Sequence, residues 1–103
     1  MKNNQDNLDL LIKINKQPKV SQRILADELG FSLGKLNYCI GALKKKGLIK
    51  IKNFKNNKNK INYIYIITPK GIKKKTLLTL NFMKRKMKEY EELKKELENK
   101  NEK

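Results

Sequence analysis

In the stretch from Ser21 to Gly47 the sequence predicts two helices, and only two residues separate the end of the first from the N-cap of the second. Ser21 is a favourable N-cap for the first helix, because its side-chain oxygen can accept a hydrogen bond from a free backbone N–H group. Gly30 suits the left-handed residue that commonly ends a helix. Ser32, which follows Phe31, can cap the second helix. A connection this short forces the two helices to cross steeply, so the segment is predicted to be a helix-turn-helix.

The second helix of this pair has an apolar side and a polar side. Leu33, Leu36, Ile40 and Leu43 recur at spacings of three and four, and Gly47 ends the helix. A solvated face is the ordinary interpretation of the polar side of such a helix. The lack of acids there, the amide and phenol groups near the N-terminus and the short preceding turn favour a recognition surface instead. This side carries Gly34, Lys35, Asn37, Tyr38, Gly41, Lys44 and Lys45.

Another helix is predicted upstream, at residues 6–16. Its leucines and isoleucines have helical spacing. It is expected to stop before Pro18, because a proline makes the helical conformation unfavourable for the residue that precedes it. In the helix that follows Ser21, we expect Ile24, Leu25 and Leu29 to be buried against its neighbours.

A β-hairpin is predicted directly after the helix-turn-helix. In residues 48–54 apolar and polar side chains alternate and the isoleucines are β-branched, and residues 61–67 form a second apolar run. That second strand is apolar on both faces, which predicts helices on one face and a neighbour on the other. Asn56 and Asn57 suit the hairpin tip. A hairpin in this place is a wing, although a solvated loop is the alternative. Contacts with a phosphate backbone or a minor groove are expected from Lys55, Lys58 and Lys60.

A long helix is predicted to begin at Thr68 and Pro69 and to run to about Asn99. Threonine suits the N-cap, and proline suits the first helical position. Farther along, Glu91 and Lys95 are spaced for an i,i+4 ion pair. The helix has an apolar seam too long for a small core to cover, so we expect a dimer contact; the alternative is a helix folded back over its own domain. The seam consists of Leu77, Leu80, Met83, Met87, Tyr90 and Leu97.

These elements predict a mainly α fold with a small β-hairpin. Residues 5–68 would form a winged helix-turn-helix DNA-binding domain, and residues 69–99 a coiled-coil-like C-terminal dimerisation helix. A chain of 103 residues has room for one such domain with an extended appendage.

The charge is strongly positive and unevenly distributed. Twenty-six Lys and Arg residues face ten Asp and Glu residues, which gives a formal charge of +16. The 60 residues from Leu29 to Lys88 contain 17 of the basic residues and no acid. A nucleic acid or an anionic membrane surface is the natural partner for such a segment.

Several classes of function are excluded by what the sequence lacks. There is no histidine and only one cysteine, so neither an internal disulfide nor a His/Cys metal site can form. No nucleophile with a base is present, so we expect no enzyme activity and no cofactor. No apolar run has the length of a membrane span, and a cytoplasmic location is expected. Cys39 lies at the edge of the apolar side of its helix, which favours a structural role over thiol sensing.

The sequence resembles winged helix-turn-helix transcriptional regulators of the MarR family. The stretch FSLGKLNYCIGALKKKGLIKIKNF, from residue 31, is similar to that family's turn, recognition helix and first wing strand. The stretch ITPKG at residues 67–71 is similar to its junction after the wing. The NYC, NFKN and TPKG stretches and the short length resemble a small subgroup, the EPS-associated transcriptional regulators.

The resemblance implies that the residues after the Ser32 cap face base edges, namely Gly34, Lys35, Asn37 and Tyr38. Their chemistry agrees: lysine can donate to guanine O6 and N7, asparagine can pair with adenine, and tyrosine can meet a phosphate or a thymine methyl. Phosphate contacts are expected from Ser21, Gln22, Ser32, Lys44, Lys45, Lys55, Lys58 and Lys60.

The expected function is that of a homodimeric, sequence-specific regulator that binds double-stranded DNA at a near-palindromic site. Two alternatives remain: a non-specific or architectural nucleic-acid binder, and a module whose basic helix docks on a protein or membrane. A small-molecule effector is not expected, because the N-terminal extension that completes the ligand cleft of larger MarR proteins is missing.

Overall fold

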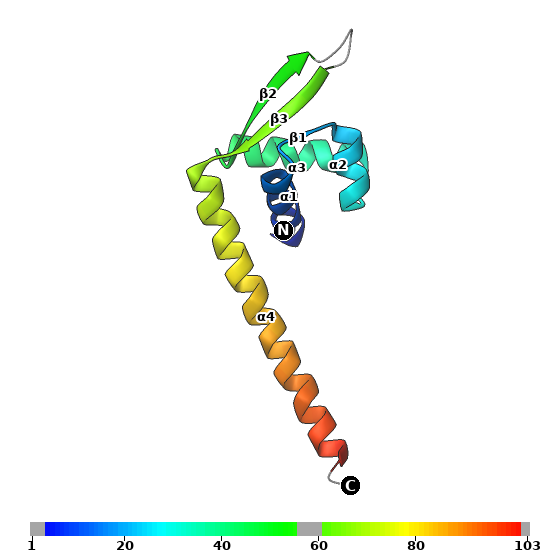
Figure 1. Ribbon diagram of the computed structural model, residues 1–103. Helices are drawn as coiled ribbons and strands as arrows, with labels where there is room; N and C mark the ends of the chain where they lie inside the picture. The colour runs from blue at the N-terminus through cyan, green and yellow to red at the C-terminus, as the bar shows by residue number, and fades with distance from the viewer. Residues whose placement is uncertain (1–3, 56–60, 102–103) are drawn as a thin grey trace.

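The computed structural model describes the backbone of residues 4–55 and 61–101, and the side chains of residues 4–52 and 63–99. Four helices and three strands follow one another along the chain (Figure 1). In order they are α1 (Asn4–Lys16), β1 (Lys19–Val20), α2 (Gln22–Leu29), α3 (Leu33–Lys45), β2 (Ile49–Lys55), β3 (Ile61–Ile67) and α4 (Pro69–Asn101). The predicted winged helix-turn-helix with a long C-terminal helix is confirmed.

The turn between α2 and α3 has the predicted chemistry. The Ser21 hydroxyl oxygen accepts a 3.2 Å hydrogen bond from the backbone N–H of Ile24. The Ser32 hydroxyl oxygen accepts one of 3.1 Å from the N–H of Lys35. Gly30 has a φ of 73°, in the left-handed region that a Cβ atom disfavours. Both caps and the terminating glycine are therefore confirmed.

The sheet has three antiparallel strands in the order β1-β3-β2, one strand more than the predicted hairpin. In β1, Val20 pairs with Tyr63 of β3, and the N–H of Tyr65 donates a 2.9 Å hydrogen bond to the carbonyl oxygen of Pro18. A two-residue strand is too short to show alternation, so the sequence did not predict it. It attaches the segment between α1 and α2 to the wing.

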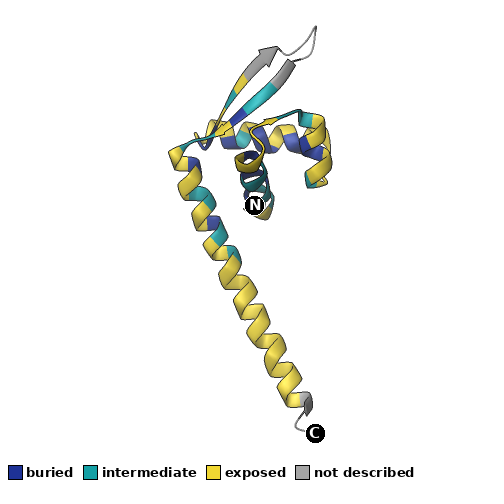
Figure 2. Cartoon of the chain, in the orientation of Figure 1, coloured by how far each residue is buried: buried dark blue, intermediate teal, exposed yellow. Residues whose placement is uncertain are grey.

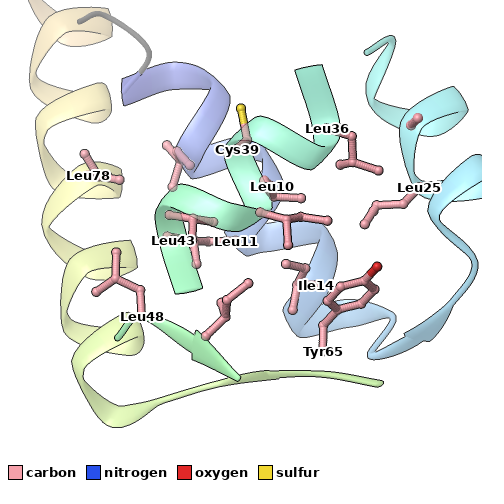
Figure 3. Packing of buried hydrophobic residues seen from close by; sticks show 14 residues of the cluster. Leu10, Leu11, Ile14, Leu25, Leu36, Cys39, Leu43, Leu48, Tyr65 and Leu78 are labelled. Carbon is pink, nitrogen blue, oxygen red and sulfur yellow. The ribbon is translucent and has the colours of Figure 1, made fainter. Parts of the chain in front are cut away.

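The core is built around α1, which packs against α2, α3, β3 and α4. Leu10 and Leu11 of α1 are fully buried and meet the buried faces of α2 and α3 (Figure 3). Other buried side chains come from all four helices, from the sheet and from the residue before β2: Leu8, Ile14, Leu25, Ala26, Leu36, Cys39, Ile40, Leu43, Leu48, Ile49, Tyr65 and Leu78.

Two apolar residues of the helix-turn-helix lie on the surface. Ile24 is 51% exposed, so the prediction that it is buried is wrong, and Leu33, which was placed on the apolar side of its helix, is 44% exposed. Each belongs to the first turn of its helix, where only one side of the helix is covered. In α2, Leu25 and Ala26 occupy that side, and Leu29 is half-buried.

The junction between the wing and α4 is a compact set of backbone contacts. The Thr68 hydroxyl donates toward the carbonyl oxygens of Gly47 at 2.7 Å and Leu48 at 3.0 Å, and it accepts from the N–H of Gly71 at 3.0 Å. A Cβ atom on Gly71 would overlap the Leu48 carbonyl oxygen. The start of α4 is therefore locked to the end of α3 and the beginning of β2.

Helix α4 leaves the body of the protein partway along its length. Leu78 is buried and Phe82 is half-buried, but every described residue from Met83 onward is exposed (Figure 2). The principal extents of 69 × 26 × 23 Å reflect this projecting helix. Hence α4 does not fold back over its own domain. Helix α4 also packs against α1, so its first part belongs to the same core as the other helices. The division into residues 5–68 and 69–99 stays a prediction. None of the described helices is both long and apolar enough to cross a bilayer.

Candidate nucleic-acid interface

The outer side of α3 presents a narrow stripe of residues to solvent. Successive residues of a helix are rotated by about 100°, so Gly34, Tyr38, Gly41 and Lys45 lie opposite the buried side of α3. Tyr38 is 72% exposed, although its phenol is largely apolar. Asn37 is also exposed and flanks this stripe on one side. The predicted base-reading residues Gly34, Asn37 and Tyr38 are thus brought together on one accessible surface.

The glycines on either side of Tyr38 are not required by the fold. Neither Gly34 nor Gly41 has a positive φ. Among the described residues, nothing lies within 4 Å of the position that a Cβ atom would take at either glycine. A glycine inside a helix costs about 0.5–1 kcal/mol relative to alanine. The helix therefore carries two destabilising residues on its exposed side, and the described part of the chain supplies no packing reason for them.

Lys35 lies on the other flank of the stripe, and its side chain turns back to the body of the protein. Its ammonium nitrogen is 3.1 Å from the Asp6 carboxylate of α1 and 4.4 Å from the centre of the Phe31 ring. The α1 acid is 29 positions away in sequence, so helix spacing alone could not reveal this pair. A contact between Lys35 and a base would therefore compete with this ion pair.

The predicted phosphate contacts near the helix N-termini also take part in the fold. Ser21 and Ser32 use a hydroxyl lone pair in their caps, which leaves each hydroxyl proton free to donate. Gln22, at the first position of α2, is half-buried beside Tyr65. Burial raises the pKa of the Tyr65 phenol, and the Gln22 side chain acts in the opposite direction. The Tyr65 hydroxyl has no well-aligned hydrogen-bond partner among the described residues.

A hollow beside the C-terminal end of α3 extends the basic surface. It has a volume of about 450 Å³ and lies between α3 and the edge strand β2. Ile49 and Ile51 contribute apolar surface, while lysines surround it. Lys44 was expected to contact phosphate, but Lys50 and Lys52 were not singled out. Their alternation with isoleucine was the available signal, because it places them on the solvent side of the strand.

The remaining wing lysines cannot be placed in the same way. Lys58 and Lys60 lie outside the described residues, as does the predicted tip at Asn56 and Asn57. Only the backbone of Lys55 is described, at the end of β2 opposite Ile61.

Cys39 lies on the inner side of α3 and is buried, with 2% of its surface exposed. Burial raises the pKa of its thiol, the nearby Asp6 carboxylate raises it further, and Lys35 lowers it. A thiol in this state is a weak nucleophile at neutral pH. The position is that of a core residue, which agrees with the expected structural role.

The predicted dimer seam is exposed along its whole length. Its six residues are at least half exposed, and Leu93, which lies outside the predicted seam, is 65% exposed and belongs with them. Leu93 lies three residues after Tyr90 and four before Leu97, next to the heptad position that Lys94 occupies.

Comparison with known proteins agrees with the winged helix-turn-helix fold described above. Residues 8–50 match the family model described as winged helix-turn-helix DNA-binding. No curated protein matches the sequence. Among solved structures, a transcriptional regulator homologue from Pyrococcus horikoshii OT3 aligns with a TM-score of 0.63 and 19% identity, over 84% of this chain and 83% of that one.

Two longer regulators are similar in the same way. Staphylococcus aureus MarR, solved with salicylate and kanamycin, aligns with a TM-score of 0.66 and 19% identity, over 84% of this chain and 57% of its own. Streptococcus pneumoniae FabT, solved with DNA, aligns with a TM-score of 0.61 and 21% identity, over 84% of this chain and 59% of its own. The chain thus spans less than two thirds of these two proteins. The closer likeness to the EPS-associated subgroup stays a prediction. The chain has the winged helix-turn-helix fold that is also found in the solved MarR-type regulators.

Proposed function

We propose that this protein is a sequence-specific DNA-binding transcriptional regulator that acts as a homodimer on a near-palindromic site. Helix α3 enters the major groove, and the wing contacts the backbone or the minor groove. The observation that carries the proposal is the pair Gly34 and Gly41, which flank the exposed Tyr38 and which the fold does not require. Their lack of side chains lets another surface approach the helix backbone closely.

The roles of the base-reading residues follow from their chemistry. The amide of Asn37 can pair with the N6 and N7 atoms of adenine, and Tyr38 can contact a thymine methyl or a phosphate. Lys35 can donate to guanine once it leaves Asp6. Gly34 provides the room in which these side chains meet the bases.

The phosphate contacts come from the regions around this stripe. Lys44 and Lys45 extend from the last turn of α3, and Lys50 and Lys52 add positive charge from β2. Such contacts place a protein on the duplex without specifying sequence. The proposed set is completed by Ser21, Gln22, Ser32, Lys55, Lys58 and Lys60.

The homodimer is proposed to form through the exposed seam of α4. Two copies would present two α3 helices to one duplex, with half-sites about one helical turn apart. The shared fold of FabT, which was solved with DNA, supports binding of double-stranded DNA. A non-specific binder is the second candidate, because 17 basic residues without an intervening acid would hold any polyanion.

Selection of bound sequences from a random DNA pool tests the proposal and separates the two candidates. We expect a symmetric motif, and we expect Asn37→Ala to lose about 1–3 kcal/mol of discrimination at one position of each half-site. Asn15→Ala is the matched control, because Asn15 is an exposed asparagine on α1, away from the α3 stripe. A pool without a motif, bound equally by wild type and Asn37→Ala, would establish the non-specific binder instead.

A further inference from the structure

The projecting part of α4 carries a continuous apolar stripe without a partner in the described chain. The stripe consists of large side chains that are each 50–65% exposed. It continues into the part of α4 in which every described residue is exposed (Figure 2). Scattered apolar residues are normal on a surface, but a contiguous stripe of this kind marks an interaction site. Its members are Leu77, Leu80, Met83, Met87, Tyr90, Leu93 and Leu97.

Charge divides this helix into two different halves. From Lys70 to Lys88 the helix carries eight basic residues and no acid. From Glu89 to Glu98 it carries five glutamates and two lysines. Each half of the helix is therefore complementary to the other half and repels a copy of itself, more strongly in the basic half.

The glutamates are left available by the folded chain. Lys86 and Glu89 form an ion pair of 3.4 Å, which is the one such pair among the described residues of α4. The expected pair between Glu91 and Lys95 does not form. All of these side chains are exposed, so a second molecule can reach them.

We propose that α4 pairs with α4 of a second copy of this chain in the antiparallel direction, with the two-fold axis near Met87. This inference rests on the proposed homodimer and specifies its geometry. Met87 lies midway between Leu77 and Leu97, so an antiparallel pair places Leu97 of one copy opposite Leu77 of the other. Reversed about Met87, the stripe coincides with itself at positions 77, 87 and 97, and each of its other members falls one residue from an apolar position of the partner.

Electrostatics selects this direction over the parallel one. In a parallel pair the two basic halves would lie side by side, eight positive charges against eight. In the antiparallel pair the glutamate-rich half of each copy runs beside the basic half of its partner. Helices in contact are about 8–10 Å apart, which is near the Debye length of about 8 Å at physiological ionic strength, so both repulsion and attraction act across the interface.

The seam does not compete with the packing of α4 on its own core. Leu78 and Phe82 face the core, whereas Leu77 and Leu80 are half exposed. Neighbouring helix positions differ by about 100° in direction, so one side of α4 binds α1 while another stays free for the partner. The C-terminal end of the second copy can therefore lie against the basic first turns of α4.

Disulfide trapping tests the direction. In a Cys39→Ala background, Met87→Cys is expected to cross-link to itself on mild oxidation, because it lies at the axis. Leu77→Cys and Leu97→Cys are expected not to self-link when used singly, and to link when the two variants are mixed and allowed to exchange. The two positions are about 30 Å apart within one helix, so this link has to join two molecules.

The possible results separate the dimer from its direction. If Met87→Cys fails to link and sedimentation finds a monomer at all concentrations, the homodimer itself fails, and the antiparallel arrangement fails with it. If Met87→Cys links and Leu97→Cys also self-links efficiently, the dimer stands but is parallel, which overturns this inference. If Met87→Cys self-links and Leu77→Cys links only to Leu97→Cys, the antiparallel arrangement is supported.

A second measurement uses charge. The double substitution Glu96→Gln and Glu98→Gln should raise the dimer dissociation constant about three- to tenfold, because it removes attraction to the partner's basic half. The effect should shrink in 0.5 M salt. In a parallel dimer the same change would relieve repulsion between glutamates and lower the constant. Asp27→Asn, on the exposed side of α2, is the control and should change nothing.

Discussion

The ammonium nitrogen of Lys35 lies 3.1 Å from the carboxylate of Asp6, so an acid of the first helix engages a residue of the proposed recognition surface. The Lys35 side chain also rests over the Phe31 ring. Its side chain is 44% exposed and that of Asp6 is 24% exposed, so the pair is accessible to solvent and can be exchanged for another anion. The Asp6 carboxylate would therefore compete with DNA for the Lys35 ammonium group.

Removal of that competitor should strengthen DNA binding. We expect Asp6→Asn to increase affinity about two- to fivefold, because Lys35 no longer has to break a partly exposed ion pair. Fluorescence anisotropy with a selected DNA site measures this. Asp9→Asn removes the same charge from the same helix but leaves the Lys35 pair intact, so it controls for net charge. Equal gains from the two variants would contradict a specific role for the pair.

Alanine at the two surface glycines of α3 should separate stability from binding. Gly34→Ala and Gly41→Ala are each expected to raise the free energy of unfolding by about 0.5–1 kcal/mol, since the added methyl meets nothing in the described chain. Affinity for DNA should fall, because the methyl occupies space that the duplex needs. Urea denaturation and anisotropy give the two values. More stable variants that bind DNA as well as wild type would remove the proposed reason for these glycines.

Gly71 should respond to alanine in the opposite way. Its methyl would overlap the Leu48 carbonyl oxygen, which Thr68 holds in place with its backbone N–H and side chain. We expect Gly71→Ala to lower the free energy of unfolding by about 1–3 kcal/mol, as overpacking does. Comparison with Gly34→Ala shows whether the loss of stability comes from the overlap with the Leu48 carbonyl oxygen or from replacement of a helical glycine in general. A neutral Gly71→Ala would mean that α4 shifts freely on the core.

The buried phenol of Tyr65 should contribute through its ring and not through its hydroxyl. The hydroxyl has no well-aligned partner among the described residues, so Tyr65→Phe removes an unsatisfied polar group and should be neutral or slightly stabilising. Tyr65→Ala should cost about 3–5 kcal/mol, as for other large aromatic truncations. Thermal and urea unfolding measure both. A marked loss in Tyr65→Phe would show that the Gln22 side chain does form a hydrogen bond there.

Alkaline pH should destabilise the fold through Cys39. Burial raises the pKa of its thiol above the ordinary 9.0, so the unfolded chain loses this proton at a lower pH than the folded chain does. The stability that Cys39 contributes is therefore complete below pH 9.0 and is lost as pH rises through the folded pKa. Denaturation curves from pH 7 to 10.5 should decline less steeply for Cys39→Ala. Identical slopes would show that the thiol titrates normally.

Much of the fold could be predicted because the signals were local. The serine caps, the terminating Gly30 and the Thr68-Pro69 start each act within a few residues, and the structure has them where they were predicted. The burial of Ile24 was predicted wrongly, and Leu33 is exposed although it lies on an apolar side, because helical spacing identifies that side but not how much of it a crossing helix covers. The Glu91–Lys95 pair failed for a related reason: exposed charges gain too little in water to hold one geometry.

The sequence by itself determined the helix-turn-helix, the wing that follows it and the basic segment, because caps, turn residues and charge are written in short stretches. Only the tertiary structure decided that β1 joins the sheet and that Lys35 turns to Asp6. It also decided that the stripe on α4 stays uncovered past Phe82. Each of these depends on which distant groups meet when α1 fills the centre of the core. Burial of apolar surface is non-directional, so a short stretch of sequence does not show which distant residues it will pack against.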